Sequence, residues 1–240
     1  MKQREVVSPS GTPDSLCGVD EAGRGPVLGP LVVVGIRTRD DGPLRDIGVR
    51  DSKKCSPQLR ERLGPQIRRF CEHVVVRKVP AERIDSLRQR MTMNDMEAEV
   101  FADIIRDLLT SRFPSGRTPG NIKVYVDAAD ANAQAFKKRI LASLGTRVDV
   151  VSEHKADVNH PVVSAASILA KLIRDEEMAK ISTELGEDVG SGYTSDPVTR
   201  AFIERTVREN GALPPYTRQS WETVRIYLNK DRKLDDFGQA

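Results

Sequence analysis

The pattern of hydrophobic and polar positions predicts a chain of alternating strands and helices. Short runs rich in Val, Ile and Leu that are bounded by turn residues indicate strands, and apolar residues spaced three or four apart indicate helices. Strands are predicted over residues 16–20, 31–37, 71–79, 122–127 and 147–152. Helices are predicted over residues 56–70, 92–112, 131–144, 161–185 and 198–210, and near 220–229. The first two strands are joined by a Gly- and Pro-rich segment and should form a hairpin.

Residues at the predicted helix ends support these boundaries. Ser56 precedes a proline, as an N-cap residue often does, and Thr92 with Asp95 is similar to a capping box. Gly145 and Gly186 follow the last periodic residues of two helices, where a left-handed glycine commonly ends a helix. Three early strands followed by alternating helices and strands predict a mixed sheet flanked by helices, with the last two helices as an annex.

Length and composition narrow the class of protein. A chain of 240 residues predicts one large domain with a small annex, and it can bury a core without disulfides or a structural metal. Hydrophobic residues at 38% and charged residues at 30% exclude a disordered tail, a collagen and a membrane protein. The longest apolar run, residues 31–36, is far shorter than a membrane span, and the N-terminus lacks the apolar core of a secretory signal. We expect a cytoplasmic protein with reduced cysteines.

The charge is unevenly distributed along the chain. The net charge of +3 says little about partners, but residues 50–90 contain 12 Lys or Arg against 5 Asp or Glu. Residues 199–233 contain 8 basic against 4 acidic residues. Such clusters suit a surface that follows a polyanion backbone, although basic helices with solvated faces explain charge alone equally well.

Four acidic residues lie where predicted strands end and turns begin: Asp20, Glu21, Asp127 and Asp157. Carboxylates that share one end of a sheet repel one another, and this repulsion raises their pKa values unless a cation neutralises them. Carboxylate oxygens without His or Cys select a hard cation such as Mg²⁺ or Mn²⁺. Two such ions can activate a water and stabilise the leaving oxygen in phosphodiester hydrolysis. The four residues are therefore candidate metal ligands.

Plainer interpretations stay open for single members of this set. An isolated Asp is more often an N-cap or a turn former, and Asp130 is best interpreted as the cap of helix 131–144. Asp127 competes for the same explanation. Neighbours in a strand point to opposite faces, so Asp20 and Glu21 converge only if the pleat breaks between them. The glycine-rich segment that follows is expected to supply that break.

Residues 23–29, Gly-Arg-Gly-Pro-Val-Leu-Gly, look superficially like a nucleotide-binding glycine loop. A dinucleotide loop must open a helix, and this one runs into a strand, so that interpretation fails. The glycines instead allow the backbone to approach a ligand closely, with successive N–H groups available to an anion or a hydroxyl. A tight hairpin turn would need the same residues.

Taken together, the motifs resemble those of type 2 ribonuclease H (ribonuclease HII) in its archaeal form. In chain order they are Gly-Val-Asp-Glu-Ala-Gly-Arg-Gly-Pro at 18–26, Asp-Ser-Lys-Lys at 51–54, Val-Tyr-Val-Asp at 124–127, His-Lys-Ala-Asp at 154–157, Ser-Ala-Ala-Ser-Ile-Leu-Ala-Lys at 164–171, Ser-Gly-Tyr at 191–193 with Ser-Asp-Pro at 195–197, and Ser-Trp at 220–221. The resemblance covers roughly residues 16–229 in the family's order, which is far more specific than any single motif.

The resemblance implies an α/β protein with a ribonuclease H-like fold, a five-stranded mixed sheet flanked by helices and a C-terminal helical substrate-binding region. The implied boundaries are an N-terminal extension at 1–15, a catalytic domain at 16–197, the helical region at 198–230 and a flexible tail at 231–240. The resemblance also implies endonucleolytic hydrolysis of the RNA strand of RNA/DNA hybrids. Incision 5′ to ribonucleotides embedded in duplex DNA, leaving 3′-hydroxyl and 5′-phosphate ends, is implied as well.

Each motif residue receives a role from the resemblance. The four acids would be catalytic and would hold two divalent cations, Mg²⁺ or Mn²⁺. The residues expected to read the ribose 2′-hydroxyl or pack on the sugar at the RNA–DNA junction are Gly23, Arg24, Gly25 and Tyr193. The residues expected to contact the rest of the substrate, mainly its phosphates, are Lys53, Lys54, Ser164, Arg218 and Ser220.

Two positions depart from the family's pattern, and the tail adds a further resemblance. Thr194 and Val198 stand where the family commonly has a proline and a basic residue, which affects loop stiffness and one phosphate contact.

Residues 231–238 resemble a degenerate sliding-clamp-binding box in which Leu234 and Phe237 would insert into the clamp. A frayed polar terminus is the alternative. We expect a monomer without a membrane partner.

Two rival functions stay open at this stage. Another two-metal nuclease of the same superfold, such as a resolvase or an exonuclease, would share the carboxylates but would not need the residues that read the 2′-hydroxyl. A non-catalytic hybrid-binding module would keep the basic surface, but it gains nothing from four anions beside a phosphate.

Overall fold

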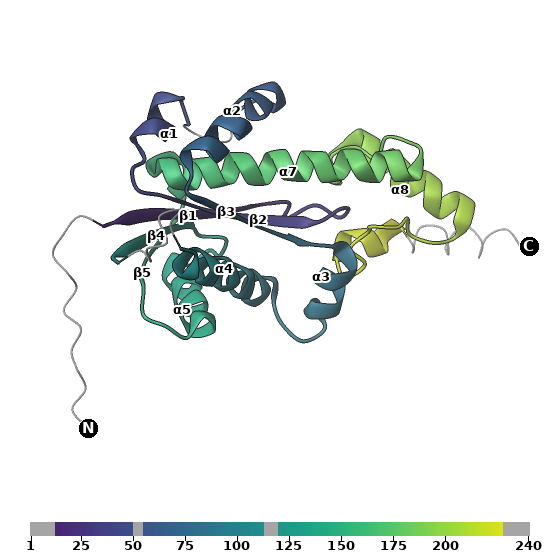
Figure 1. Cartoon of the computed structure of the whole chain (residues 1–240). Coiled ribbons are helices and arrows are strands. Elements are labelled where there is room, and N and C mark those ends of the chain that lie inside the picture. The colour runs from purple at the N-terminus through teal and green to yellow at the C-terminus, as the bar shows by residue number, and fades with distance from the viewer. Residues whose placement is uncertain (1–12, 50–54, 113–119, 228–240) are drawn as a thin grey trace, which may run out of the picture.

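The computed structural model describes residues 13–49, 55–112 and 120–227, and its centre is a five-stranded sheet with the order β3-β2-β1-β4-β5 (Figure 1). β1 is antiparallel to β2, and β2 is antiparallel to β3, whereas β1, β4 and β5 are parallel. The predicted mixed sheet and the predicted hairpin are therefore confirmed. The strands are β1 (Ser15–Ala22), β2 (Leu31–Thr38), β3 (His73–Val79), β4 (Ile122–Asp127) and β5 (Asp149–Glu153).

Helices cover both faces of the sheet (Figure 1). α7 packs on β1 and β2 on one face, where α1 and α2 lie beside it, and α4 and α5 cover the other face. The labelled helices are α1 (Gly42–Asp46), α2 (Pro57–Phe70), α3 (Ala81–Arg88), α4 (Met93–Thr110), α5 (Ala133–Leu144), α6 (Ala156–Asn159), α7 (Pro161–Leu185) and α8 (Pro197–Asn210). Residues 222–227 are also helical, within the range predicted near 220–229. None of the helices in the described ranges is both long and apolar enough to span a membrane.

Each face of the sheet buries its own apolar cluster because side chains alternate along a strand. Cys17 and Val19 of β1 face the cluster under α4 and α5. Val32 and Val34 of β2 face the cluster under α7. β2 is buried at every position, as expected for a strand covered by helices on both faces.

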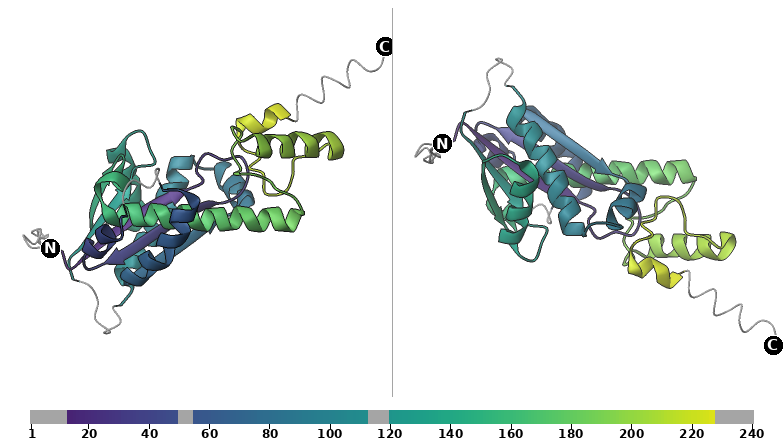
Figure 2. Two further views of the ribbon diagram at one scale, coloured as in Figure 1. Left: turned by 90° about the horizontal axis from the view of Figure 1, so that it is seen from above. Right: turned by 90° about the horizontal axis from the view of Figure 1, so that it is seen from below.

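A third apolar cluster lies at the end of α7 that extends past the sheet. Met178 and Ile181 of α7 pack there against Val27 and Leu28 and against Phe202 of α8. α8 and the chain that follows it gather at this end of α7, opposite the side of β4 and β5 (Figure 2). The annex predicted from the last helices thus packs on the long helix and on the glycine-rich loop.

The cap residues confirm most of the predicted helix boundaries. Ser56 accepts a hydrogen bond from the amide of Leu59, and Thr92 and Asp95 form a reciprocal capping box. Gly145 and Gly186 end α5 and α7 with φ angles of 69° and 70°.

The prediction that Asp130 caps helix 131–144 was wrong. α5 begins at Ala133, and its N-cap is Asn132, whose Oδ1 accepts from the amide of Ala135 at 3.0 Å. Asp130 instead accepts from the Asn132 amide at 3.1 Å and pairs with Arg139 at 2.6 Å. An Asp and an Asn two residues apart are both good caps, so the sequence does not distinguish them, and in the structure the Asp130 carboxylate is engaged by Arg139 instead.

Candidate active site

The parallel strands bring the four candidate acids to one edge of the sheet. Asp20 and Glu21 lie near the end of β1, Asp127 is the last residue of the adjacent β4, and Asp157 lies in α6, just after β5. Asp20 is 4% exposed and Asp157 is 2% exposed, whereas Glu21 and Asp127 are half-buried. The topology therefore gathers carboxyl groups that are more than a hundred residues apart in the sequence.

The expected break in the pleat after Asp20 is absent. β1 continues to Ala22, and Glu21 and Ala22 still pair with Val33 and Val32 of β2. The amide of Glu21 donates to Asp20 Oδ1 at 2.7 Å, so the Asp20 carboxyl bends back along the strand towards its neighbour. The two carboxyl groups thus influence each other in an unbroken strand.

Burial raises the pKa of both Asp20 and Glu21. The charges of Glu21 and Asp127 raise the pKa of Asp20 further, and the Ser167 hydroxyl and the Glu21 amide act in the opposite direction. Asp127 likewise raises the pKa of Glu21, whereas Arg24 lowers it. Mutual repulsion between buried carboxylates is therefore present at this edge, as the sequence predicts.

Asp127 and Asp157 are linked through the start of α6. The amide of Ala156, the first residue of α6, donates to Asp127 Oδ1 at 3.0 Å. Lys155 immediately before it has a φ of 60°, a left-handed conformation that turns the chain out of β5 and into the helix. The last side chain of β4 thus holds the short helix that contains Asp157.

The donor chemistry of the cluster fits a hard divalent cation. All four residues offer carboxylate oxygens, and Glu21 Oε2 is buried with no hydrogen-bond partner among the described residues. Within residues 13–49, 55–112 and 120–227, no three His, Cys, Asp or Glu side chains form a ready-made metal cage. Mg²⁺ commonly binds one or two carboxylates together with waters and substrate phosphates, so such a cage is not required.

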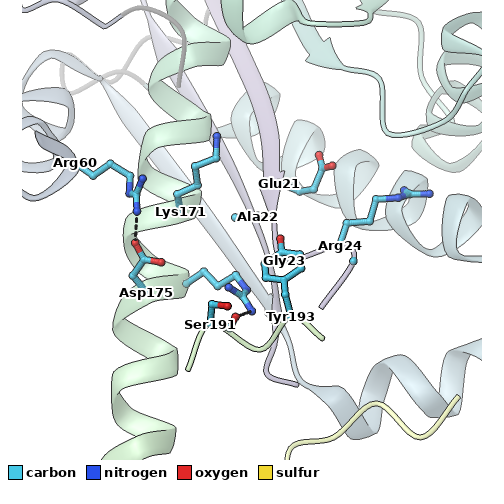
Figure 3. A pocket seen from close by; sticks show the side chains of 11 residues that line it. Glu21, Ala22, Gly23, Arg24, Arg60, Lys171, Asp175, Ser191 and Tyr193 are labelled. Carbon is cyan, nitrogen blue, oxygen red and sulfur yellow. Dashed lines mark hydrogen bonds and ion pairs between the residues drawn. The ribbon is translucent and has the colours of Figure 1, made fainter. Parts of the chain in front are cut away.

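A cavity of about 330 Å³ adjoins the acidic cluster, and Glu21 belongs to both (Figure 3). Lys171 and Asp175 of α7 lie on one side of it, opposite Gly23 and Arg24. Its lining residues are Glu21, Ala22, Gly23, Arg24, Gly25, Arg60, Lys171, Arg174, Asp175, Ser191 and Tyr193. The predicted sugar-reading residues are thus brought together beside the carboxylates.

Tyr193 faces the glycine loop across this cavity. Its side chain remains 40% exposed, and a Cβ built on Gly25 would lie 3.7 Å from Tyr193 Cε1. The Arg174 guanidinium lies 5.4 Å from the centroid of the Tyr193 ring and donates to the Ser191 carbonyl at 2.8 Å. The loop that contains Tyr193 is therefore supported from α7, with the ring left accessible.

The Arg24 side chain is held by α4. Its guanidinium pairs with the carboxylate of Glu97, which is fully buried, and donates to Asn94 Oδ1 at 2.7 Å. Sequence reasoning missed Glu97 and Asn94. Glu97 had a detectable signal, because it lies at helical spacing from Phe101 and Ile104 on a face that should be apolar.

The other predicted substrate contacts have different surroundings. Ser164 is buried within α7 at 1% exposure, and Lys53 and Lys54 lie outside the described residues. Arg218 is fully buried, and its guanidinium donates to protein carbonyls rather than facing solvent. The amide and the hydroxyl of Ser220 both donate to Asp85 Oδ1, at 2.9 and 2.6 Å. Arg218 and Ser220 thus contact the protein's own loops, because the C-terminal segment folds back on them.

This arrangement of sheet, helices and acidic edge is a ribonuclease H-like fold. The crystal structure of ribonuclease H2 from Pyrococcus horikoshii OT3 superposes with a TM-score of 0.79 at 40% sequence identity, and covers 91% of this chain and 99% of that chain. The ribonuclease HII in a structure of the PCNA:RNase HII complex from Archaeoglobus fulgidus gives a TM-score of 0.76 at 38% identity, and covers 86% of this chain and 95% of that one.

Sequence comparison gives the particular family. The family model "Ribonuclease HII" matches residues 17–224. Ribonuclease HII of Methanococcoides burtonii is 41% identical over 221 residues, which cover 89% of this chain and 99% of that relative. The chain belongs to the ribonuclease HII family of hydrolases.

Proposed function

We propose that the protein is an endonuclease that hydrolyses the RNA strand of RNA/DNA hybrids and incises 5′ to ribonucleotides embedded in duplex DNA. The observation that carries this proposal is the continuity of the acidic cluster with the cavity through Glu21. A reacting phosphate beside the carboxylates would place the adjoining sugar between the glycine loop and Tyr193. Family membership supports the same activity.

Asp20, Glu21, Asp127 and Asp157 would hold two divalent cations, Mg²⁺ or Mn²⁺. When bound, such ions supply an activated water and neutralise charge on the leaving oxygen, which yields 3′-hydroxyl and 5′-phosphate ends. The chain contributes carboxylate oxygens from two buried and two half-buried side chains, and Ser167 adds a hydroxyl contact to Asp20. The unpartnered Glu21 Oε2 and the raised pKa values of Asp20 and Glu21 favour this assignment.

The cavity supplies the contacts for the sugar and phosphates. Gly25 leaves space beside the Tyr193 ring into which a ribose would fit, and the 2′-hydroxyl is the group that distinguishes RNA from DNA there. Lys171 and Arg174 give the cavity positive charge that suits a phosphodiester backbone, and Arg60 adds a cation that pairs with Asp175 at 2.8 Å. Lys53 and Lys54 remain proposed phosphate contacts on the strength of the motif alone.

The proposal is tested by incubating the protein with a DNA duplex that contains one ribonucleotide, beside an all-DNA duplex of the same sequence. We expect incision of the first duplex alone, dependent on Mg²⁺ or Mn²⁺ and abolished by a chelator. Cleavage of both duplexes would instead indicate a general nuclease. Binding without cleavage under either metal would indicate a non-catalytic module.

We also propose a sliding clamp as a partner, bound through Leu234 and Phe237, which lie outside the described residues. The A. fulgidus ribonuclease HII in complex with PCNA supports this proposal. A chain that ends at Lys230 should bind an archaeal clamp more weakly than the full chain in a titration, with unchanged nuclease activity. Equal clamp affinity of the two chains would contradict it.

A further inference from the structure

Arg218 connects the C-terminal segment to the glycine loop through three main-chain carbonyls. Its guanidinium donates to Gly23 O at 2.6 Å, to Arg24 O at 2.9 Å and to Gly29 O at 3.0 Å. Its own amide donates to Val27 O at 2.8 Å, so main chain and side chain hold the same loop. Residues almost two hundred positions apart are thereby joined at one point.

Burying the Arg218 guanidinium is energetically unfavourable unless its surroundings compensate for the lost hydration. The Arg218 side chain is fully buried, and no carboxylate of the described residues pairs with its guanidinium. Burial and the nearby charge of Arg174 lower the pKa of Arg218 to about 9. Buried charges are retained where hydrogen bonds compensate for lost hydration, and here the carbonyls of the loop provide that compensation.

Because the peptide bond is planar, the contacts of Arg218 with the loop carbonyls also fix the direction of the loop amides. In a trans peptide the C=O and the following N–H point in opposite directions, and the described chain contains no cis peptide. Because Gly23 O and Arg24 O both point towards Arg218, the amides of Arg24 and Gly25 both point away from it. Neither amide donates to another described residue, and both residues line the cavity that contains Tyr193.

We propose that Arg218 is a positioning residue for sugar discrimination, which orients the Arg24 and Gly25 amides so that they can donate to a ribose 2′-hydroxyl in the cavity. This inference rests on the proposed function and adds to it a residue from the C-terminal segment that does not itself touch the substrate. It differs from a phosphate contact, because a phosphate contact strengthens binding to RNA and DNA alike.

The test compares two duplexes that differ in one sugar, ribose or deoxyribose, at the same position. The affinity of the full-length protein for each is measured by fluorescence anisotropy with a chelator present, and the ratio of the two affinities is the readout. The variants are Arg218→Met and Arg218→Lys. The matched control is Arg88→Met, because Arg88 and Arg218 both lie over the Trp221 ring, at 5.6 and 5.0 Å, and only Arg218 donates to the loop.

We expect Arg218→Met to lower the preference for ribose about tenfold, with the affinity for the all-DNA duplex unchanged, since one well-placed hydrogen bond contributes on this scale. Arg88→Met should keep the wild-type ratio. Arg218→Lys keeps the charge but not the forked donor, so its ratio should lie between those of the wild type and Arg218→Met. If thermal unfolding shows that Arg218→Met does not fold, the ratio of Arg218→Lys decides.

An unchanged ratio in a folded Arg218 variant would overturn the inference and leave the proposed function intact. An equal loss of affinity for both duplexes would also overturn it, because that result identifies a direct backbone contact. If the wild-type protein itself shows no preference for ribose, the inference fails, and the metal-dependent cleavage assay separately decides the proposed function.

Discussion

Gly23 and Gly25 flank Arg24 in the same loop, yet a methyl group would meet different surroundings at each. At Gly23 the φ angle is 85°, and a Cβ would lie 2.4 Å from Arg174 Nε and 2.7 Å from Pro30 O. At Gly25, apart from the adjoining residues of the chain, the only described atom within 4 Å would be Tyr193 Cε1, at an ordinary contact distance of 3.7 Å. The first glycine is thus required by the fold, whereas the second leaves open space beside Tyr193.

Because their surroundings differ, alanine at Gly23 should mainly lower stability, whereas alanine at Gly25 should mainly lower activity. Gly23→Ala should destabilise the protein by about 1–3 kcal/mol, because it strains the backbone and overpacks Arg174. Gly25→Ala should change stability by less than about 1 kcal/mol and lower incision at a single ribonucleotide at least tenfold. Denaturant unfolding and initial cleavage rates measure the two effects. Full activity of Gly25→Ala would contradict a sugar site beside Tyr193.

The raised pKa of Asp20 should make the free energy of unfolding of the metal-free protein depend on pH. Burial favours the protonated form in the folded state, so the folded pKa lies above the unfolded value of 3.8. Between those two pKa values the folded state binds more protons, so the free energy of unfolding falls as pH rises through this window. Asp20→Asn removes this effect, and its Oδ1 can still accept from the Glu21 amide.

We therefore expect Asp20→Asn to unfold at a higher temperature than the wild type at neutral pH in chelator, with a smaller difference in acid. Adding Mn²⁺ should raise the unfolding temperature of the wild type and have less effect on the variant, because ligand binding stabilises only the state that binds it. Parallel pH profiles of wild type and variant would show that the Asp20 charge is not destabilising.

At the scale of secondary structure, local signals predicted the long elements and missed the short ones. Thr92, Gly145 and Gly186 mark helix ends because capping depends on residues close in sequence. α1, α3 and α6 have 5, 8 and 4 residues, too few for a helical period to be read. α6 in addition depends on the side chain of Asp127, which reaches it from another strand.

Asp127 thus has two roles in the structure, one as a helix-capping acceptor and one as a candidate metal ligand. Asp127→Asn keeps an Oδ1 that can accept from the Ala156 amide but removes the charge, so α6 should form and stability should stay within about 1 kcal/mol. Cleavage should fall by several orders of magnitude while most substrate affinity remains, because basic side chains provide the affinity. Circular dichroism, anisotropy and cleavage rates test these three expectations, and near wild-type turnover would contradict the ligand assignment.

At the scale of the whole molecule, the sequence predicted the mixed sheet, the acidic edge and a helical annex. It did not predict that the annex folds back on the glycine loop, because that contact depends on a bridge between Leu28 and Thr217. The residues next to Arg218 in the sequence do not show whether its side chain is buried or faces solvent as a phosphate contact. Its burial depends on contacts with segments far away in the sequence, and the residue pattern does not reveal those contacts.

The proposed function requires the cavity beside Tyr193 and the four carboxylates to act on the same substrate in a fixed spatial relation. The most direct test maps the incision at single-nucleotide resolution in a series of duplexes in which one ribonucleotide is moved along the strand. The cut should move with the ribonucleotide, always on its 5′ side, and leave a 3′-hydroxyl and a 5′-phosphate. A cut whose position is independent of the ribonucleotide, or that varies between its two sides, would contradict the proposed function.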